Sequence, residues 1–265
     1  MRRLALTGVL LGSLALSLPA TAAASTLPAG NHARVGARLP DSGHGHGHSS
    51  STFGWTSSNW SGYALSGSKG SYSQITGTWT VPTVVRTKGS TYSSSWIGID
   101  GFNNSSLIQT GTEQDYTAGH AQYYAWWEIL PAAETQITTM TVSPGDSMTA
   151  SIVNDGGGSW TITLKDVTQS ESFTTTQSYS GPASSAEWIE EAPTVGGRVA
   201  TLADYTEATF NPGSVNGGNN PSLVVNDGGV MVQKRQQVST PSLPDHDTDG
   251  FNVAYGSTTP SAPST

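Results

Sequence analysis

From Phe53 onward, apolar and polar residues alternate in short segments that are separated by turn-forming residues. The two-residue period of a β-strand is clear in residues 73–81, which read SQITGTWTV, and in residues 159–164, which read SWTITL. Sustained helical periodicity is missing from this part of the sequence. Gly, Pro, Asn and Asp gather where hairpins would turn, at 144–146, 154–157, 195–197 and 226–229. The pattern predicts an all-β domain over residues 53–256, an antiparallel β-sandwich of two sheets.

The N-terminal residues have the character of a secretory signal peptide. Arg2 and Arg3 precede an apolar run over residues 4–18, and small residues follow at 20–24. The run is shorter than the ~20 apolar residues that a membrane span needs, and no later segment is a candidate for one. We therefore expect residues 1–24 to be removed and the protein to be extracellular, with no membrane partner afterwards.

Residues 25–52 form a polar segment that we interpret as a pro-segment or linker. It contains Pro, Gly and Ser and almost nothing apolar to bury. A tract of alternating His and Gly at 44–48 can bind a metal, but such a tract is more typical of a solvated spacer. Two Arg and four His stand against one acid, Asp41, so the segment becomes cationic below pH ~6 and can dock on an acidic cleft. At the other end, residues 257–265 are predicted to be a disordered tail.

Composition excludes several partners. The chain has 11 Lys and Arg against 19 Asp and Glu, and its formal net charge is -8. A surface this poor in cations cannot neutralise a row of phosphates, which excludes nucleic acid and anionic membranes as partners. The absence of Cys excludes disulfides, Cys-based metal sites and a Cys nucleophile. We expect a monomer that uses neither a cofactor nor a metal.

Four of the predicted strands place acidic or amide side chains beside large aromatic residues. Residues two apart on a strand share a face of the sheet. The residues that align in this way are Trp96, Gly98 and Asp100; Gln109, Gly111 and Glu113; Trp126 and Glu128; and Glu187, Ile189 and Glu191. If these strands are neighbours, they form one concave acidic face walled by Trp. Desolvation by the aromatic rings raises carboxyl pKa values, which suits a general acid or base.

Six segments, in order along the chain, carry a resemblance to a known family. They are SNWSGY at 58–63, GTWTVP at 77–82, WIGIDG at 96–101, LIQTG at 107–111, WWE at 126–128 and AEWI at 186–189. With these segments, the chain from about Trp55 to Tyr255 resembles the glutamic peptidases, also called eqolisins.

The resemblance implies an acid-active endopeptidase that acts on protein and peptide substrates. It also implies a lectin-like (concanavalin-like jelly-roll) sandwich of two seven-stranded sheets. The catalytic pair of the family falls on Gln109 and Glu187. Four further residues match positions that line the family's cleft, and Glu113 stands where an Asp is expected; the predicted substrate-binding residues are thus Trp96, Asp100, Glu113, Trp126 and Glu128. The fungal members contain disulfides, so this chain depends on packing alone for stability.

The chemistry of amide hydrolysis supports this pair independently. The reaction needs a base for the water proton, a donor for the developing oxyanion and an acid for the leaving nitrogen. Ionised Glu187 can take the proton and later donate it to the amine, while the Gln109 amide donates to the oxyanion. Residues 25–52 are then expected to keep the enzyme inactive near neutral pH and to be removed in acid by self-cleavage.

Two other functions fit the same residues. A β-sandwich glycoside hydrolase would use Glu128 and Glu187 as its two carboxylates. A carbohydrate-binding module would use the Trp residues without catalysis. Separately, residues 245–250, DHDTDG, begin like a calcium-binding loop. The twelfth position is Gly256 and not Glu, and no helices are predicted on either side, so we interpret this stretch as a polar turn between the last two strands.

Overall fold

The computed structural model describes residues 37–39 and 52–264 of the 265-residue chain. The strands are β1 Trp55–Ser57, β2 Trp60–Ser66, β3 Gln74–Thr80, β4 Ser94–Ile99, β5 Ile108–Thr117, β6 His120–Ile129, β7 Thr135–Gln136, β8 Ser147–Gly156, β9 Ser159–Asp166, β10 Glu171–Ser178, β11 Ser185–Glu191, β12 Thr194–Val195, β13 Arg198–Val199, β14 Ala208–Val215, β15 Gly228–Gln233, β16 Gln236–Pro241 and β17 Phe251–Tyr255. A single 3-10 turn, η1 Val225–Asp227, is the one helical element that these described residues form.

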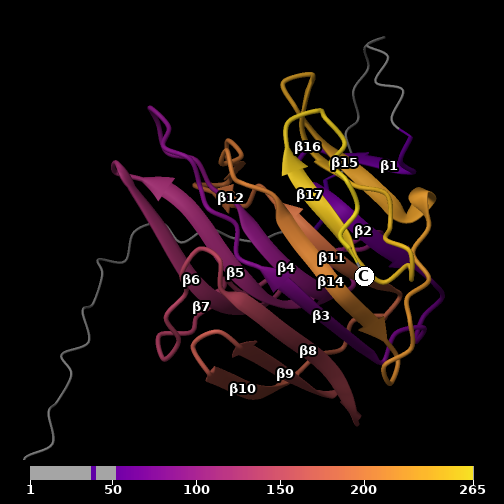
Figure 1. Cartoon of the computed structure of the whole chain (residues 1–265). Helices are drawn as coiled ribbons and strands as arrows, with labels where there is room; N and C mark the ends of the chain where they lie inside the picture. Colours follow the sequence, from indigo (N-terminus) through magenta and orange to yellow (C-terminus); the bar gives the residue numbers. More distant parts are fainter. Residues whose placement is uncertain (1–36, 40–51, 265) are drawn as a thin grey trace, which may run out of the picture. The chain divides into compact units, whose positions relative to one another are not determined.

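Fifteen of these strands form one continuous sheet that folds over on itself into two layers (Figure 1). One layer runs β10-β9-β8-β3-β14-β17-β16, and the pairing of β16 with β15 continues the sheet into the other layer, β15-β2-β11-β4-β5-β6-β7. Strand β1 pairs with β15 outside this path and is parallel to it, while β12 and β13 form a separate small ribbon. The predicted antiparallel β-sandwich is confirmed, and its two layers are parts of one continuous sheet rather than two separate sheets.

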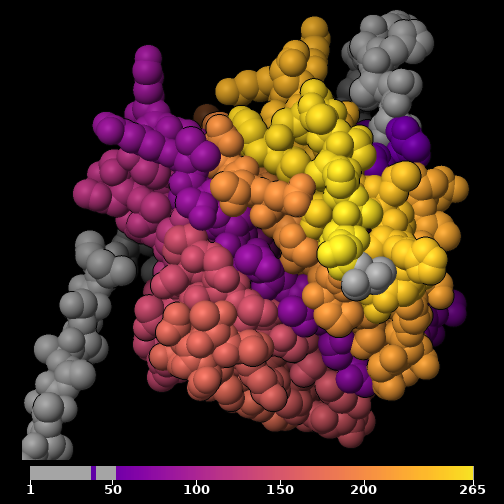
Figure 2. Space-filling model, in the orientation of Figure 1, coloured from indigo at the N-terminus to yellow at the C-terminus, as the bar shows by residue number. Residues whose placement is uncertain are grey.

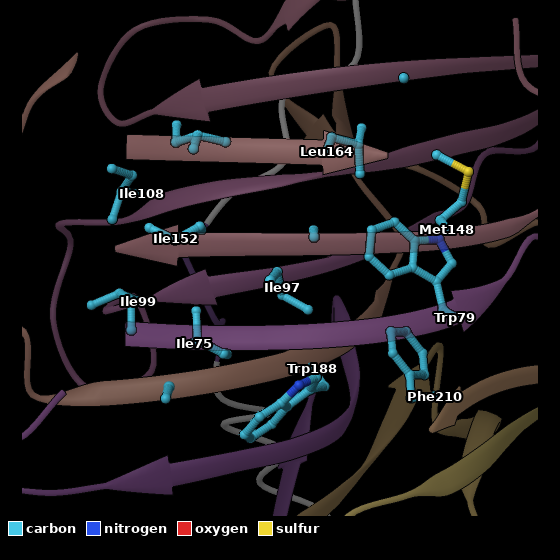
Figure 3. Close-up of a cluster of buried hydrophobic side chains, with 14 of the residues drawn as sticks. Ile75, Trp79, Ile97, Ile99, Ile108, Met148, Ile152, Leu164, Trp188 and Phe210 are labelled. Atoms are coloured by element: carbon cyan, nitrogen blue, oxygen red, sulfur yellow. The ribbon is translucent and has the colours of Figure 1, made fainter. Parts of the chain in front are cut away.

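The main hydrophobic core lies between the two layers and follows the predicted alternation. In β3 and β9 every second residue is buried, including Ile75, Trp79 and Ile162. Figure 3 shows the side chains that meet there: Ile97, Ile99, Ile108 and Trp188 from one layer, and Ile75, Trp79, Met148, Ile152, Leu164 and Phe210 from the other. Each fully buried large apolar side chain contributes roughly 1.5–3 kcal/mol, so this core supplies the stability that disulfides supply elsewhere.

Two tryptophans also join the layers by hydrogen bonds. The indole of Trp188 in β11 donates to the carbonyl of Thr76 in β3 over 2.8 Å. The indole of Trp79 in β3 donates to the hydroxyl of Thr112 in β5 over 3.0 Å. Because buried N–H groups are costly when they lack an acceptor, these bonds fix how the two layers face one another.

One of the four predicted turns is wrong. Residues 154–157 join β8 to β9 and residues 195–197 join β12 to β13, while 144–146 precede β8, as expected. Residues 226–229, however, run from η1 into β15, where Gly228 and Gly229 pair with β2. A Cβ on Gly229 would lie 1.9 Å from the Trp55 ring. The second glycine therefore serves close packing rather than a tight turn.

The two ends of the chain were predicted to lie outside the folded domain. Residues 257–264 form no helix or strand, although the Asn252 side chain in β17 donates to the Ser261 carbonyl over 3.0 Å. The predicted signal peptide and the His tract lie outside the described residues. Within the described residues, no helix is long and apolar enough to span a membrane.

Candidate active site

The predicted catalytic residues lie in one row across neighbouring strands. Glu187 in β11 pairs with Gly98 in β4, which pairs with Gln109 in β5, which pairs with Glu128 in β6. Directly paired residues of antiparallel strands point to the same side of the sheet, so the three polar side chains share a face. This face points away from the main core.

Gly98 leaves a gap between the two proposed catalytic side chains. Glu187 and Gln109 are two strands apart, or about 10 Å between their backbones. A Cβ at Gly98 would lie 2.8 Å from the Trp96 ring and 3.3 Å from the Gln109 Cβ. It would also lie 3.0 Å from Leu107, so a side chain at this position would displace Trp96 or Leu107 and press on Gln109.

The adjacent rows supply the aromatic and acidic surroundings. Next to the Glu187 row lie Ile189, Trp96, Gly111 and Trp126, and beyond them lie Glu191, Ser94, Glu113 and Tyr124. We call these residues, with Glu187, Gly98, Gln109 and Glu128, the acidic face. Trp96 and Trp126 pack with Trp60, Leu107 and Ile189 in a small apolar cluster.

Hydrogen bonds fix the orientation of the two tryptophans on this face. The Trp96 indole donates to Glu191 Oε2 over 3.1 Å, and the Trp126 indole donates to the Ser94 hydroxyl over 3.2 Å. The Trp60 ring meets the Trp96 ring edge-on, with 4.9 Å between their centroids. The rings are thus held as rigid walls.

Gln109 is oriented by Glu128. Its Nε2 atom donates to Glu128 Oε2 over 2.8 Å, and both side chains are fully buried. A carboxylate accepts only from the NH2 end of an amide, so the bond fixes which end of Gln109 faces β6.

Glu187 has an environment that differs from that of Gln109. It is fully buried, and neither of its carboxylate oxygens makes a hydrogen bond of good geometry to any described residue. Burial raises the pKa of Glu187 well above its usual range; the nearby Ser185 hydroxyl partly opposes this rise, and the charge of Asp100 adds to it. A carboxylate with a raised pKa is a stronger base, and its two oxygens can accept hydrogen bonds from a water molecule that enters the site.

Asp100 lies just beyond β4 and binds the loop that leads into β11. It has a positive φ of 73° and accepts hydrogen bonds from the Tyr179 hydroxyl over 2.6 Å, the Ala183 N–H over 2.7 Å and the Ser184 N–H over 2.9 Å. Asp100 thereby fixes the start of the strand that carries Glu187. Its predicted contact with substrate stays a prediction.

A second acidic group surrounds Glu113, and sequence reasoning missed most of it. Burial raises the pKa of Glu113 well above its usual range, that of Asp115 to about 7 and that of Glu134 to about 8. The charges of Asp115 and Glu134 raise the pKa of Glu113 further, and the Tyr124 hydroxyl donates to Glu134 Oε1 over 2.8 Å. Asp115 follows Glu113 by two residues, and this spacing predicts that it shares the face of Glu113. Glu134 lies in a loop and follows no strand pattern.

Residues 37–39 belong to the predicted pro-segment and contact the edge of the acidic face. The Arg38 N–H donates to the Gly101 carbonyl over 3.1 Å, and the Ser58 N–H donates to the Leu39 carbonyl over 2.9 Å. The Asn59 amide donates both to the Ala37 carbonyl and to Glu191 Oε1, each over 3.2 Å. One side chain thus joins the segment to the acidic face.

The contacts of the Arg38 side chain are aromatic rather than ionic. Its guanidinium lies 4.3 Å from the centroid of the Phe102 ring and 5.9 Å from that of Trp55. Its Nε atom donates to the Phe102 carbonyl over 3.1 Å. Residues 37–39 are therefore held by cation–π contacts and hydrogen bonds.

A separate open hollow of about 610 Å³ lies where Tyr116, near the end of β5, meets the loop around Arg86 and Lys88. None of the predicted site residues lines it.

The geometry of this site is compatible with a peptidase, a glycoside hydrolase or a carbohydrate-binding module, and a comparison with protein families distinguishes between them. Residues 58–255 match the model of the peptidase A4 family. The chain belongs to the peptidase A4 family. The match covers most of the described domain, and the predicted resemblance to the eqolisins is confirmed.

Two curated proteins of known name are similar to this member of the A4 family. The chain is 31% identical over 189 residues to aspergillopepsin-2 of Aspergillus niger, across 61% of this chain and 66% of that protein. It is 32% identical over 139 residues to scytalidopepsin B of Scytalidium lignicola, across 51% of each. The chain thus spans less than two thirds of the length of these relatives.

A solved structure shows the fold expected for the A4 family. The crystal structure of scytalido-glutamic peptidase with a transition state analog inhibitor has a TM-score of 0.65 to this chain. The two are 24% identical, and the alignment covers 75% of this chain and 98% of that chain. This likeness confirms the β-sandwich.

Proposed function

We propose that this chain is a secreted, acid-active endopeptidase that hydrolyses peptide bonds with Glu187 and Gln109. The observation that carries the proposal is the single row in which Glu187 and Gln109 face the same side across Gly98. Membership of the A4 family supports it, as do the names of the two peptidase relatives. Secretion is supported by the pattern of residues 1–24, and we expect the enzyme to be a monomer.

In the first step, water attacks the peptide carbonyl. The ionised form of Glu187 accepts the water proton; the raised pKa makes this form a minor species in acid but a stronger base than an ordinary carboxylate. Gln109 donates a hydrogen bond to the oxyanion, a role that an ionised carboxylate cannot fill. The bond to Glu128 holds this amide in place, which lowers the cost of reorganisation during the reaction.

In the second step, the tetrahedral intermediate breaks down. Glu187, now protonated, donates its proton to the leaving nitrogen, the carbon–nitrogen bond breaks and the carboxyl product forms. Glu187 returns to the ionised state without a metal, a Ser or a Cys. We propose that Trp96, Asp100, Glu113, Trp126 and Glu128 contact or position the peptide on either side of the cleaved bond.

Two substitutions in the row test the proposal. Gln109→Ala and Glu187→Gln should each abolish the cleavage of an acid-denatured protein at about pH 3–4, a loss of at least ~100-fold. The control is Thr163→Ala, on the outer side of the other layer, with circular dichroism to verify folding. Full proteolysis by either site variant would rule out the catalytic pair.

The glycoside hydrolase alternative is less well supported. Glu128 and Glu187 stand three strands apart, Glu128 Oε2 already accepts a hydrogen bond from Gln109, and the matched family is a peptidase family. Assaying polysaccharide digestion in parallel discriminates the two functions. A glycosidase would need Glu128 and Glu187 but would tolerate the loss of the Gln109 amide. Hydrolysis of neither substrate would favour a binding module.

We also propose that residues 25–52 are an inhibitory pro-segment. The contacts of residues 37–39 with Asn59, Gly101 and the Phe102 ring support this proposal. N-terminal sequencing of the secreted protein after acid treatment should find a start beyond residue 39. Arg38→Ala should speed this processing, whereas Arg86→Ala, which removes an exposed cation elsewhere, should not. A fully active enzyme that still starts near Ser25 would refute the proposal.

A further inference from the structure

The loop between β16 and β17 brings three carboxylates together. It contains the sequence DHDTDG at 245–250, and the Asp245 N–H donates to the Gly250 carbonyl over 2.9 Å to close the turn. The loop joins the last two strands, as expected. One oxygen from each of Asp245, Asp247 and Asp249 lies within 4.8 Å of the others. A polar turn alone does not require this approach of three like charges.

Asp245 is the buried member of the group. It is 5% exposed, and its Oδ1 atom accepts hydrogen bonds from the N–H groups of Asp249 and Gly250, each over 3.1 Å. Its Oδ2 atom is buried and has no hydrogen-bond donor among the described residues, and the same holds for Asp249 Oδ1. Buried carboxylate oxygens that face other carboxylates need a proton or a cation as a partner.

The geometry points to a calcium ion as this partner, and we propose that Asp245, Asp247 and Asp249 form a Ca²⁺ site. Calcium binds oxygen ligands at about 2.3–2.6 Å, so two of its ligands lie at most about 5 Å apart. The three oxygens meet this limit. Aspartates at positions one, three and five followed by Gly at position six are the spacing that calcium loops use. Mg²⁺ is smaller and demands near-ideal octahedral geometry, so it fits this loop less well.

The position of the loop indicates what a bound ion would do. The Tyr63 hydroxyl, in the main core, donates to the Ser242 carbonyl over 2.8 Å, and the Ser242 N–H donates to the Asn252 carbonyl over 2.7 Å. The loop is therefore tied to β2 and to β17. Figure 2 shows the C-terminal part of the chain, in yellow, at the surface of the molecule, and Asp247 in this loop is exposed. An ion here would stabilise the connection between the last two strands.

The missing twelfth-position Glu sets the expected affinity. A loop with three aspartates and no bidentate Glu has fewer ligands than a calcium sensor, so we expect dissociation constants of about 10⁻⁴–10⁻³ M, as in extracellular modules. Such an affinity is suited to a protein that meets millimolar calcium outside the cell. The site is remote in sequence from Gln109 and Glu187 and does not depend on the proposed peptidase activity.

Thermal unfolding of the whole secreted protein tests the site at about pH 6, where free carboxyls are ionised. Addition of about 10 mM CaCl2 should raise the melting temperature by at least about 2 °C over MgCl2 at the same ionic strength, and EDTA should reverse the rise. Asp247→Asn should lose this rise. Asp247 is exposed, so the variant should fold. Asp155→Asn, an exposed acid in the β8–β9 turn, should keep the rise.

Equilibrium dialysis with calcium gives a second measurement, with one ion per chain expected for the wild type and for Asp155→Asn. An Asp247→Asn variant that binds calcium as the wild type does would overturn the proposal. So would a wild type that shows no calcium-specific rise and binds no ion, because the carboxylates would then share protons instead.

Discussion

The two outer sides of the sandwich have the same strand geometry and opposite chemistry. On the acidic face, all the side chains that point away from the core except Tyr124 are buried, and every residue of β4 and β11 is buried. In β3, β8 and β9, buried residues that face the core alternate with partly or fully exposed ones on the outer side, and no residue of β10 is fully buried. Strands β4 and β11 are thus buried on both sides: one side packs in the main core, and the other side carries the acidic face.

The outer side of the second layer is covered by hydroxyl groups, and we call it the hydroxyl face. Ser214, Thr76, Ser151, Thr163 and Thr174 form one row across five strands. Neighbouring hydroxyls bond to one another, as between Thr76 and Ser214 over 2.6 Å and between Thr163 and Thr174 over 3.2 Å. This face interacts with water through groups that do not titrate in acid.

The contrast between the acidic face and the hydroxyl face accounts for the low content of charged residues, which is 11% of the chain. With 19 acids in the chain, six lie on the acidic face or beside it: Glu113, Asp115, Glu128, Glu134, Glu187 and Glu191. The hydroxyl face keeps the surface wetted without adding positive charge as the pH falls. These six acids thus lie where the proposed chemistry needs them, while the other thirteen lie elsewhere in the chain.

The largest effect is expected from a substitution that fills the gap at Gly98 on the acidic face. Gly98→Ala should lower kcat/KM for peptide cleavage at least about tenfold, because the new methyl group would displace Trp96 or Leu107 and press on Gln109. It should also destabilise the domain by roughly 1–3 kcal/mol through overpacking. Peptide kinetics and urea unfolding measure the two effects.

The matched change on the hydroxyl face is Thr163→Ala. It should leave the activity unchanged and alter the free energy of unfolding by no more than about 0.5 kcal/mol, apart from the loss of one exposed hydrogen bond. If Gly98→Ala retains wild-type kcat/KM, then the spacing between Glu187 and Gln109 is not what the reaction requires.

Much of this arrangement could be predicted from the sequence. The two-residue period in segments such as 73–81 indicates strands because that spacing places one kind of side chain on each side of a sheet. The same spacing aligned Trp96 with Gly98 and Gln109 with Glu113, and the six motif segments identified the family.

Other features depend on strand pairing, which a local pattern does not encode. The row that joins Glu187 to Gln109 through Gly98 arises from the order β11-β4-β5, in which strands distant in the sequence become neighbours. The glycines at 228 and 229 had the composition of a turn, but their role is set by the rings of Trp55 and Tyr63. Glu134 reaches Tyr124 from a loop, so no periodicity marks it.

A smaller effect is expected from the acidic group around Glu113, which should make the free energy of unfolding depend on pH. Burial raises the pKa of Asp115 to about 7 and that of Glu134 to about 8, so the folded state binds protons more tightly than the unfolded chain. The stability from this source is fully present below the unfolded pKa values of about 4 and is lost as the pH rises through 7 and 8. The domain should therefore be most stable in acid.

Glu113→Gln tests this account because Gln resembles the protonated carboxyl and cannot ionise. Its free energy of unfolding should match the wild type at about pH 4 and exceed it at about pH 7, where Glu113 ionises in the unfolded chain but burial opposes its ionisation in the folded one. Asp155→Asn, at the end of the hydroxyl face, should run parallel to the wild type at every pH. If Glu113→Gln also runs parallel to the wild type, the buried carboxyls do not set the pH range of the fold, and the two faces differ in packing alone.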